Sequence, residues 1–186
     1  MKQIFGVILF TLLACSSFAQ VYDLPDSLKN ASYTKSLQYL DQEISKEKDW
    51  NEKKIHLTLC KSFWLTKNWN YDLAMEVFKT IPSTEAKLKS TSGTYMLTHA
   101  ILLKYKNEPQ LSLNNFRKAI AFFKTHSVEK ECYARIELAE FYRKIGQLDF
   151  GLEELKRVEL IMGFLNNSKS SNLYLKYLNR KAAILN

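Results

Sequence analysis

Glycine and proline are scarce in this chain, which has five glycines and three prolines among its 186 residues. β-Sandwiches and β-barrels need many tight turns, and tight turns use these two residues, so both folds are disfavoured. Three cysteines are too few for a disulfide scaffold. Apolar residues make up 46% of the sequence and charged residues 25%, which is typical of a globular protein rather than a disordered one. The composition therefore predicts an all-α protein with an excess of positive charge.

Hydrophobic runs of transmembrane length are also missing, because the main apolar run, Ile4–Ala14, is only eleven residues long and a bilayer needs about 20. Lys2 precedes this run and small residues follow it, which is the layout of a secretory signal peptide. Cleavage after Ala19 predicts a signal peptide at residues 1–19 and a mature module at residues 20–186.

A second interpretation of the same segment stays open. Leu12-Leu13-Ala14-Cys15 resembles the box of bacterial lipoproteins, in which Cys15 would carry the lipid. The two interpretations predict an exported protein of the periplasm or cell surface, or alternatively an outer-membrane lipoprotein. Membrane contact is expected only through lipid on Cys15 or through a longer chain that continues into a transmembrane helix.

A repeated pattern sets the predicted architecture. The pattern is a small residue followed by apolar residues one and four positions later. It begins at Ser36, Ala74, Ser112 and Gly151. The period is 38 or 39 residues, and the spacing within each segment places the small and large residues on one side of a helix. A small residue at this position lets another helix approach closely, so each repeat is expected to be a pair of helices joined by a short turn. The predicted hairpins cover about 50–81, 91–125 and 129–163, with flanking helices at about 27–47 and 170–186.

Residues 132–161 resemble a tetratricopeptide repeat (TPR). The matching residues are Leu138, Ala139, Tyr142, Gly146, Gly151, Leu155 and Val158. The unit at 93–126 fits less fully, and the unit at 54–82 fits through Leu59, Cys60 and Phe63 only if its turn holds one extra residue. The resemblance implies a right-handed α-solenoid whose first helices line a concave groove for a peptide or helix.

The resemblance also implies candidate contact residues in that groove. They are Lys54, Lys61 and Trp64 in the first hairpin, Leu97, Ile101, Lys104 and Tyr105 in the second, and Ile136, Glu140, Arg143 and Lys144 in the third. Five of these residues are basic, so the expected ligand is a protein or peptide, with an acidic segment as the favoured chemistry.

No residue pattern indicates catalysis. The sequence lacks nucleophile, phosphate-loop and zinc-protease motifs. His56 and Cys60 are four residues apart, but two ligands do not make a zinc site, and Cys60 and Cys132 are interpreted as buried thiols. The carboxylates Glu131, Glu137 and Glu140 alternate with basic residues, which favours a solvated charged face. No enzyme activity, metal or cofactor is expected, and nucleic acid is not an expected partner because the basic residues are spread thinly.

The predicted function is a non-catalytic interaction or sensor module. The layout is similar to the N-terminal extracytoplasmic repeat regions of Bacteroidetes regulatory proteins, which implies the sensing part of a larger signalling regulator. The alternative is a self-contained periplasmic or lipid-anchored protein that binds or assembles other envelope components. The last helix is an apolar first helix without a second one after it. That feature predicts either a truncated array or self-association through residues 173–185.

Overall fold

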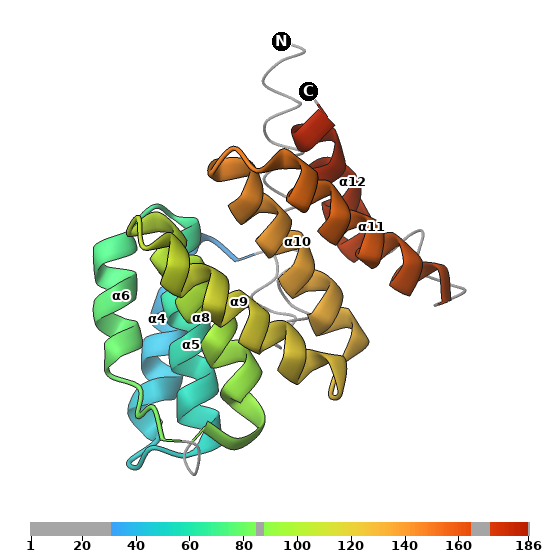
Figure 1. Ribbon diagram of the computed structural model, residues 1–186. Coiled ribbons are helices and arrows are strands. Elements are labelled where there is room, and N and C mark those ends of the chain that lie inside the picture. The colour runs from blue at the N-terminus through green and yellow to red at the C-terminus, as the bar shows by residue number, and fades with distance from the viewer. Residues whose placement is uncertain (1–30, 85–87, 165–171, 186) are drawn as a thin grey trace. The chain divides into compact units, whose positions relative to one another are not determined.

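The computed structural model describes residues 31–84, 88–164 and 172–185 (Figure 1). In these ranges it contains eight α-helices, one short 3-10 helix at Lys89–Thr91, and no strand. The prediction of an all-α fold is therefore confirmed for the described part of the chain. The predicted signal peptide at residues 1–19 and the lipidation candidate Cys15 lie outside the described residues.

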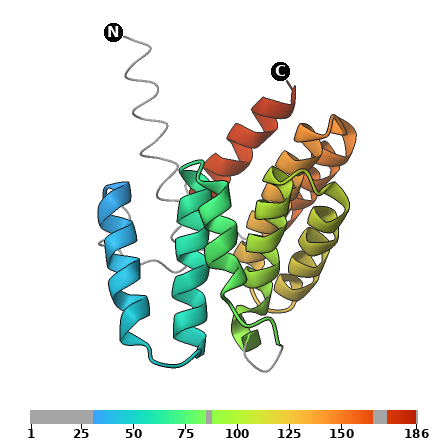
Figure 2. The same ribbon diagram turned by 90° about the vertical axis from the view of Figure 1, so that its left-hand side faces the viewer.

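The helices fall into two compact units, which we call the N-terminal unit (up to Phe122) and the C-terminal unit (from Phe123). The helices of the N-terminal unit are α4 (Tyr33–Lys46), α5 (Glu52–Lys67), α6 (Tyr71–Lys79), α8 (Ser92–Tyr105) and α9 (Pro109–Lys124, up to the boundary). Figure 2 shows α4, in blue, alongside α5. The C-terminal unit contains α10 (Val128–Lys144), α11 (Leu148–Phe164) and α12 (Asn172–Leu185).

Polar residues before the helices determine where several of them begin. The side chain of Ser32 accepts a hydrogen bond from the backbone N–H of Lys35 at the start of α4. Asn51 does the same for Lys54 at the start of α5, at 2.8 Å, and Ser127 for Lys130 at the start of α10. Each of these side chains satisfies an N–H that has no partner within the helix, which stabilises the helix by about 1 kcal/mol.

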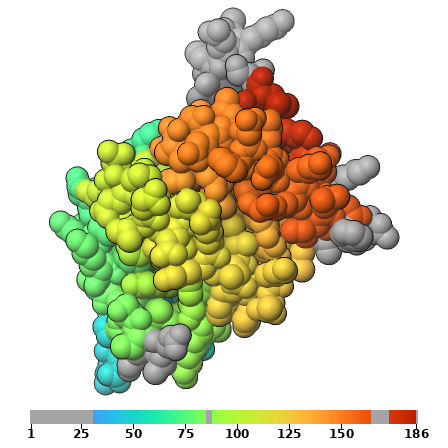
Figure 3. All heavy atoms as spheres, viewed as in Figure 1, coloured from blue at the N-terminus to red at the C-terminus, as the bar shows by residue number. Residues whose placement is uncertain are grey.

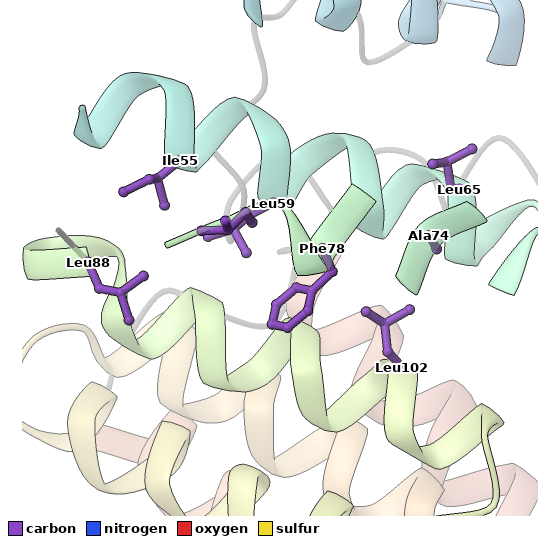
Figure 4. Packing of buried hydrophobic residues seen from close by; sticks show 8 residues of the cluster. Ile55, Leu59, Leu65, Ala74, Phe78, Leu88 and Leu102 are labelled. Carbon is purple, nitrogen blue, oxygen red and sulfur yellow. The ribbon is translucent and has the colours of Figure 1, made fainter. Parts of the chain in front are cut away.

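The core of the N-terminal unit lies between α5, α6 and α8 (Figure 4). Ile55 and Leu59 project from α5 toward α8, while Leu65 lies further along α5. These three side chains, together with Phe78 of α6 and Leu102 of α8, are at most 3% exposed. Burial of one such side chain contributes about 1.5–3 kcal/mol. This cluster therefore holds the first helix pair to the first helix of the next pair.

Each helix pair crosses at two small residues that are twelve positions apart. The hydroxyl of Ser62 in α5 donates to the carbonyl oxygen of Ala74 in α6 at 2.8 Å. The hydroxyl of Ser112 in α9 donates to the carbonyl oxygen of Ala100 in α8, also at 2.8 Å. In the third pair, a Cβ added to Gly151 would lie only 3.2 Å from the carbonyl oxygen of Ala139. The small residue of the repeated pattern is thus the point of closest approach in all three pairs.

The carboxylates of the C-terminal unit are not arranged as the sequence suggested. Glu131, Glu137 and Glu140 on α10 are between 3% and 8% exposed, and so is Glu154 on α11. The prediction of a solvated charged face is therefore wrong for Glu131, Glu137 and Glu140. It failed because their partners include residues far away in the sequence, on α11 and α12.

Arg135 joins two of these carboxylates. Its guanidinium group lies 2.8 Å from a Glu131 oxygen and 2.6 Å from a Glu154 oxygen. Burial alone would lower the pKa of Arg135, but the hydrogen bonds that it donates to Glu131 and Glu154 outweigh that effect and raise the pKa. Arg135 therefore remains positively charged and connects α10 with α11 through its two carboxylate partners.

Candidate functional site

The helices of each pair are joined by turns of the same length, and the three turns share one backbone hydrogen bond. The turns occupy residues 68–70, 106–108 and 145–147. In each turn the backbone N–H of the third residue donates to a carbonyl oxygen five residues earlier. The three bonds are Asn70 to Leu65 at 3.0 Å, Glu108 to Leu103 at 3.1 Å, and Gln147 to Tyr142 at 2.9 Å. These are the bonds of a Schellman motif, which closes the C-terminus of a helix.

The middle residue of each turn has a left-handed backbone. The φ angle is 64° at Trp69, 59° at Asn107 and 75° at Gly146. Glycine adopts this conformation without a steric penalty and asparagine tolerates it, but a bulky residue is strained there by about 1–2 kcal/mol. The three positions are 38 and 39 residues apart, so the turns provide an internal comparison in which only Trp69 is unsuited to its position.

Trp69 receives little compensation from packing, because 78% of it is exposed to solvent. Its ring has an edge contact with Tyr71, at 6.2 Å between centroids and 72° between planes. Tyr71 in turn stacks on Tyr105 from α8, at 4.2 Å and 16°. We call Trp69, Tyr71 and Tyr105 the aromatic row. It lies at the end of the N-terminal unit where the first two helix pairs turn.

Charged residues beside the aromatic row are paired with groups of the same unit. The Lys104 ammonium lies 4.9 Å from the centre of the Tyr105 ring, which suits a cation–π contact. Lys106 forms an ion pair with Asp72. Burial raises the pKa of Tyr71, while its hydrogen bond with Tyr105 acts in the opposite direction. The two lysines beside the aromatic row therefore already have contacts within their own unit.

Several residues predicted to line a groove are buried instead. Trp64, Leu97, Ile101 and Ile136 are between 0% and 5% exposed. They contribute to the interior of the protein, so they do not present a contact surface to a ligand. Glu140 is 8% exposed and accepts from Arg143 at 2.8 Å and also from Arg180.

The basic residues predicted for the groove have partners within their own unit. Lys54 donates to the carbonyl oxygen of Glu47 at 2.8 Å, and Lys61 forms an ion pair with Asp41 of α4. An acidic ligand would have to compete with these contacts, and with the Glu140 partner of Arg143. Lys144 is exposed, and the groove itself stays a prediction.

The register predicted for the first helix pair was wrong. The predicted register aligns Cys60 with Ala139 and needs one extra residue in the turn, whereas Ser62 makes the contact with Ala74 and the turn is as long as the other two. Lys54, Lys61 and Trp64 were chosen in the incorrect register. In the observed register, Ile136 and Leu97 correspond to Leu59.

The remaining candidates for chemistry among the described residues are the cysteines and any metal-binding cluster. Cys60 and Cys132 are both buried thiols outside any disulfide, as predicted, and burial together with Glu131 raises the pKa of the Cys132 thiol to about 12. Within residues 31–84, 88–164 and 172–185, no three His, Cys, Asp or Glu residues lie close enough to hold a metal ion. In the same ranges no helix is long and apolar enough to cross a membrane.

No family model, no curated protein and no solved structure matches this chain. The sequence had not singled out Trp69. Trp69 could have been found from the repeat, because it precedes Asn107 by 38 residues and Asn107 precedes Gly146 by 39. This alignment requires the first turn to have the same length as the other two.

Proposed function

We propose that this chain is a non-catalytic protein-binding module, built as an exported TPR-like α-solenoid, and that the aromatic row is its contact surface. The observation that carries the proposal is Trp69, a strained and exposed tryptophan at a position where the other two turns have asparagine and glycine. A residue that breaks a local folding rule without a gain in packing is a candidate for a functional role.

The composition of the aromatic row suits a protein partner. Tryptophan and tyrosine are enriched in the energetically dominant positions of protein interfaces, because they bury a large area and lose little conformational freedom. The stacking of Tyr71 on Tyr105 holds two of the rings in place before binding. Since Lys106 is already paired with Asp72, the surface favours a partner that buries apolar side chains over one recognised by charge alone.

The repeated geometry supports the TPR-like part of the proposal. Three helix pairs share the same turn, the same crossing of small residues and the same period, and stacked helical pairs of this type bind proteins through their exposed surfaces. The pairs belong either to the sensing part of a larger regulator or to a self-contained envelope protein. Both versions use the same surface.

Site-specific photo-crosslinking in the producing cell tests the contact surface. A photoreactive amino acid replaces Trp69 in one variant and Leu160, which is 58% exposed on α11, in the control. The expected result is a covalent adduct with one protein at position 69 and none of that protein at position 160. The purified partner should then bind a Trp69→Gly variant at least about 30-fold more weakly, as for a dominant aromatic contact. Equal crosslinking at both positions contradicts the proposal.

A further inference from the structure

The last helix, α12, directs its charged residues toward its own unit. The ammonium of Lys176 lies 2.7 Å from Glu137, Arg180 pairs with Glu140, and Lys181 lies 3.2 Å from Glu159 of α11. Hydrogen bonds from Tyr177 and Lys181 lower the pKa of Glu159. All three basic residues of α12 are therefore matched by carboxylates of α10 and α11.

The opposite side of α12 is apolar and open to solvent. Leu175, Leu178 and Leu185 are 39%, 40% and 63% exposed, and Ala182 is exposed between them. These four residues, which we call the outer stripe, follow the spacing i, i+3, i+7 and i+10. This is the a/d spacing of a helix that packs against another helix. The helix also buries Leu173, Tyr177 and Ile184, so α12 is apolar on two sides, whereas a surface helix ordinarily has one apolar side that faces the interior.

The period of the chain indicates what kind of element would cover the outer stripe. A step of 39 residues from Ile136 and Ala139 of α10 leads to Leu175 and Leu178. Ile136 and Ala139 are fully buried, and Ala139 lies where α10 crosses α11 at Gly151. The corresponding side of α12 thus suits a helix, but Leu178 replaces the small residue, so the covering helix must supply a small residue of its own.

We infer that α12 of a second copy of this chain covers the outer stripe, in antiparallel orientation. The antiparallel pairing places Leu178 against Ala182 of the second copy and Leu175 against Leu185 of the second copy, so that a large residue meets a small one at the centre. A parallel pairing would place Ala182 against Ala182 and leave a gap. The outer stripe itself has no charged residue, and the neighbouring Lys181 is paired with Glu159 of its own unit. A contact between identical helix faces is the arrangement of a two-fold dimer.

Sedimentation of the full chain, in the form that the producing cell leaves after processing, tests the inference. It is expected to show a reversible dimer with a dissociation constant on the order of 10 µM, because the contact is small. Leu178→Lys should raise that constant at least about tenfold, because it buries an unpaired charge in the contact. Leu160→Lys is the matched control, since Leu160 is a similarly exposed leucine on α11, whose outer side is seen in orange in Figure 3, and it should leave the dimer unchanged.

Further variants distinguish the outcomes. Leu185→Lys is the second test variant because Leu185 is the most exposed leucine of the outer stripe, and its replacement leaves the interior intact. Circular dichroism confirms that each variant is folded. Ala182→Leu should weaken an antiparallel dimer by crowding Leu178, whereas it would strengthen a parallel one. A chain that sediments as a monomer at all concentrations, or a dimer that both lysine variants leave intact, overturns the inference and assigns the stripe to another occupant. The outcome is independent of the aromatic row, which lies in the other unit.

Discussion

The side chains of Glu137 on α10 and Lys176 on α12 form an ion pair at 2.7 Å although they are only 3% and 12% exposed. The Lys176 ammonium also lies 3.6 Å from the centre of the Tyr133 ring. An unpaired charge in the interior is strongly unfavourable. The pair therefore matters for stability mainly because the loss of either partner would leave the other charge uncompensated.

Removal of the lysine from this pair is expected to destabilise the C-terminal unit. Lys176→Met removes the cation that is paired with the buried Glu137 carboxylate and should lower the free energy of unfolding by about 3 kcal/mol. The double variant Glu137→Met with Lys176→Met removes both charges and should regain most of the loss. Urea unfolding followed by circular dichroism measures both, and a double variant as unstable as the single one would contradict the explanation.

The turn residues predict opposite effects of glycine at equivalent positions. Trp69→Gly relieves a strained backbone and should raise the free energy of unfolding by about 1 kcal/mol, with a smaller gain for Asn107→Gly. Gly146→Ala should lower it by about 1 kcal/mol through backbone strain alone, since nothing lies within 4 Å of the added Cβ. Urea midpoints of the three variants test the series. A destabilised Trp69→Gly variant would show that the indole ring contributes to folding.

Two glycines of α11 provide a matched pair for the crossing of α10 and α11. A Cβ at Gly151 would lie 3.1 Å from Ile184 and 3.2 Å from the backbone oxygen of Ala139, whereas a Cβ at Gly163 meets nothing. Gly151→Ala is expected to lower stability by about 1–3 kcal/mol, because two helices must separate. Gly163→Ala should raise stability by up to about 1 kcal/mol, because alanine favours the helix. The melting temperatures of the two variants distinguish the effect of close packing from that of helix propensity. Equal changes in melting temperature would exclude a tight crossing at Gly151.

His99 predicts a pH dependence of the N-terminal unit. Burial lowers the pKa of His99, with a partly opposing effect of Glu108, and the ring stacks on Phe78 at 4.9 Å. The folded state therefore binds this proton less tightly than the unfolded state does. Its contribution to stability is complete above the ordinary histidine pKa of about 6.5 and is lost as the pH falls from there to the folded-state value.

The difference between the wild type and His99→Gln isolates this effect from the carboxylates that titrate at lower pH. Urea midpoints at several pH values between about 5 and 8 should fall on acidification more steeply for the wild type than for the variant. His126→Gln, at an exposed histidine, is the control and should follow the wild type. Parallel curves for wild type and His99→Gln would contradict the prediction.

The sequence was informative about the helices and about the residues at which they cross. The small residues Ala74, Ser112 and Gly151 were identified from their period, and each lies at a crossing. The period was sufficient because a close approach of two helices tolerates only small side chains, whichever sequence surrounds them.

The period of the sequence does not predict the register of the first helix pair or the burial of the carboxylates. Cys60 and Ser62 are both small, and only the length of the turn decides which of them meets Ala74. Glu137 and Glu140 appeared solvated because their partners on α12 are 39 and 40 residues further along the chain. A pattern within one helix contains no information on partners at that separation.

The pairing of α10 with α12 also affects the order of events during synthesis. Glu137 and Glu140 emerge well before Lys176 and Arg180, so for an interval the nascent α10 lacks the two ion pairs that these carboxylates form with α12, although Glu140 already has Arg143 beside it. Burying the two carboxylates before those cations arrive is costly. The C-terminal unit is therefore expected to complete its folding only after residue 180 has been released, which keeps α10 and α11 accessible until the final helix arrives.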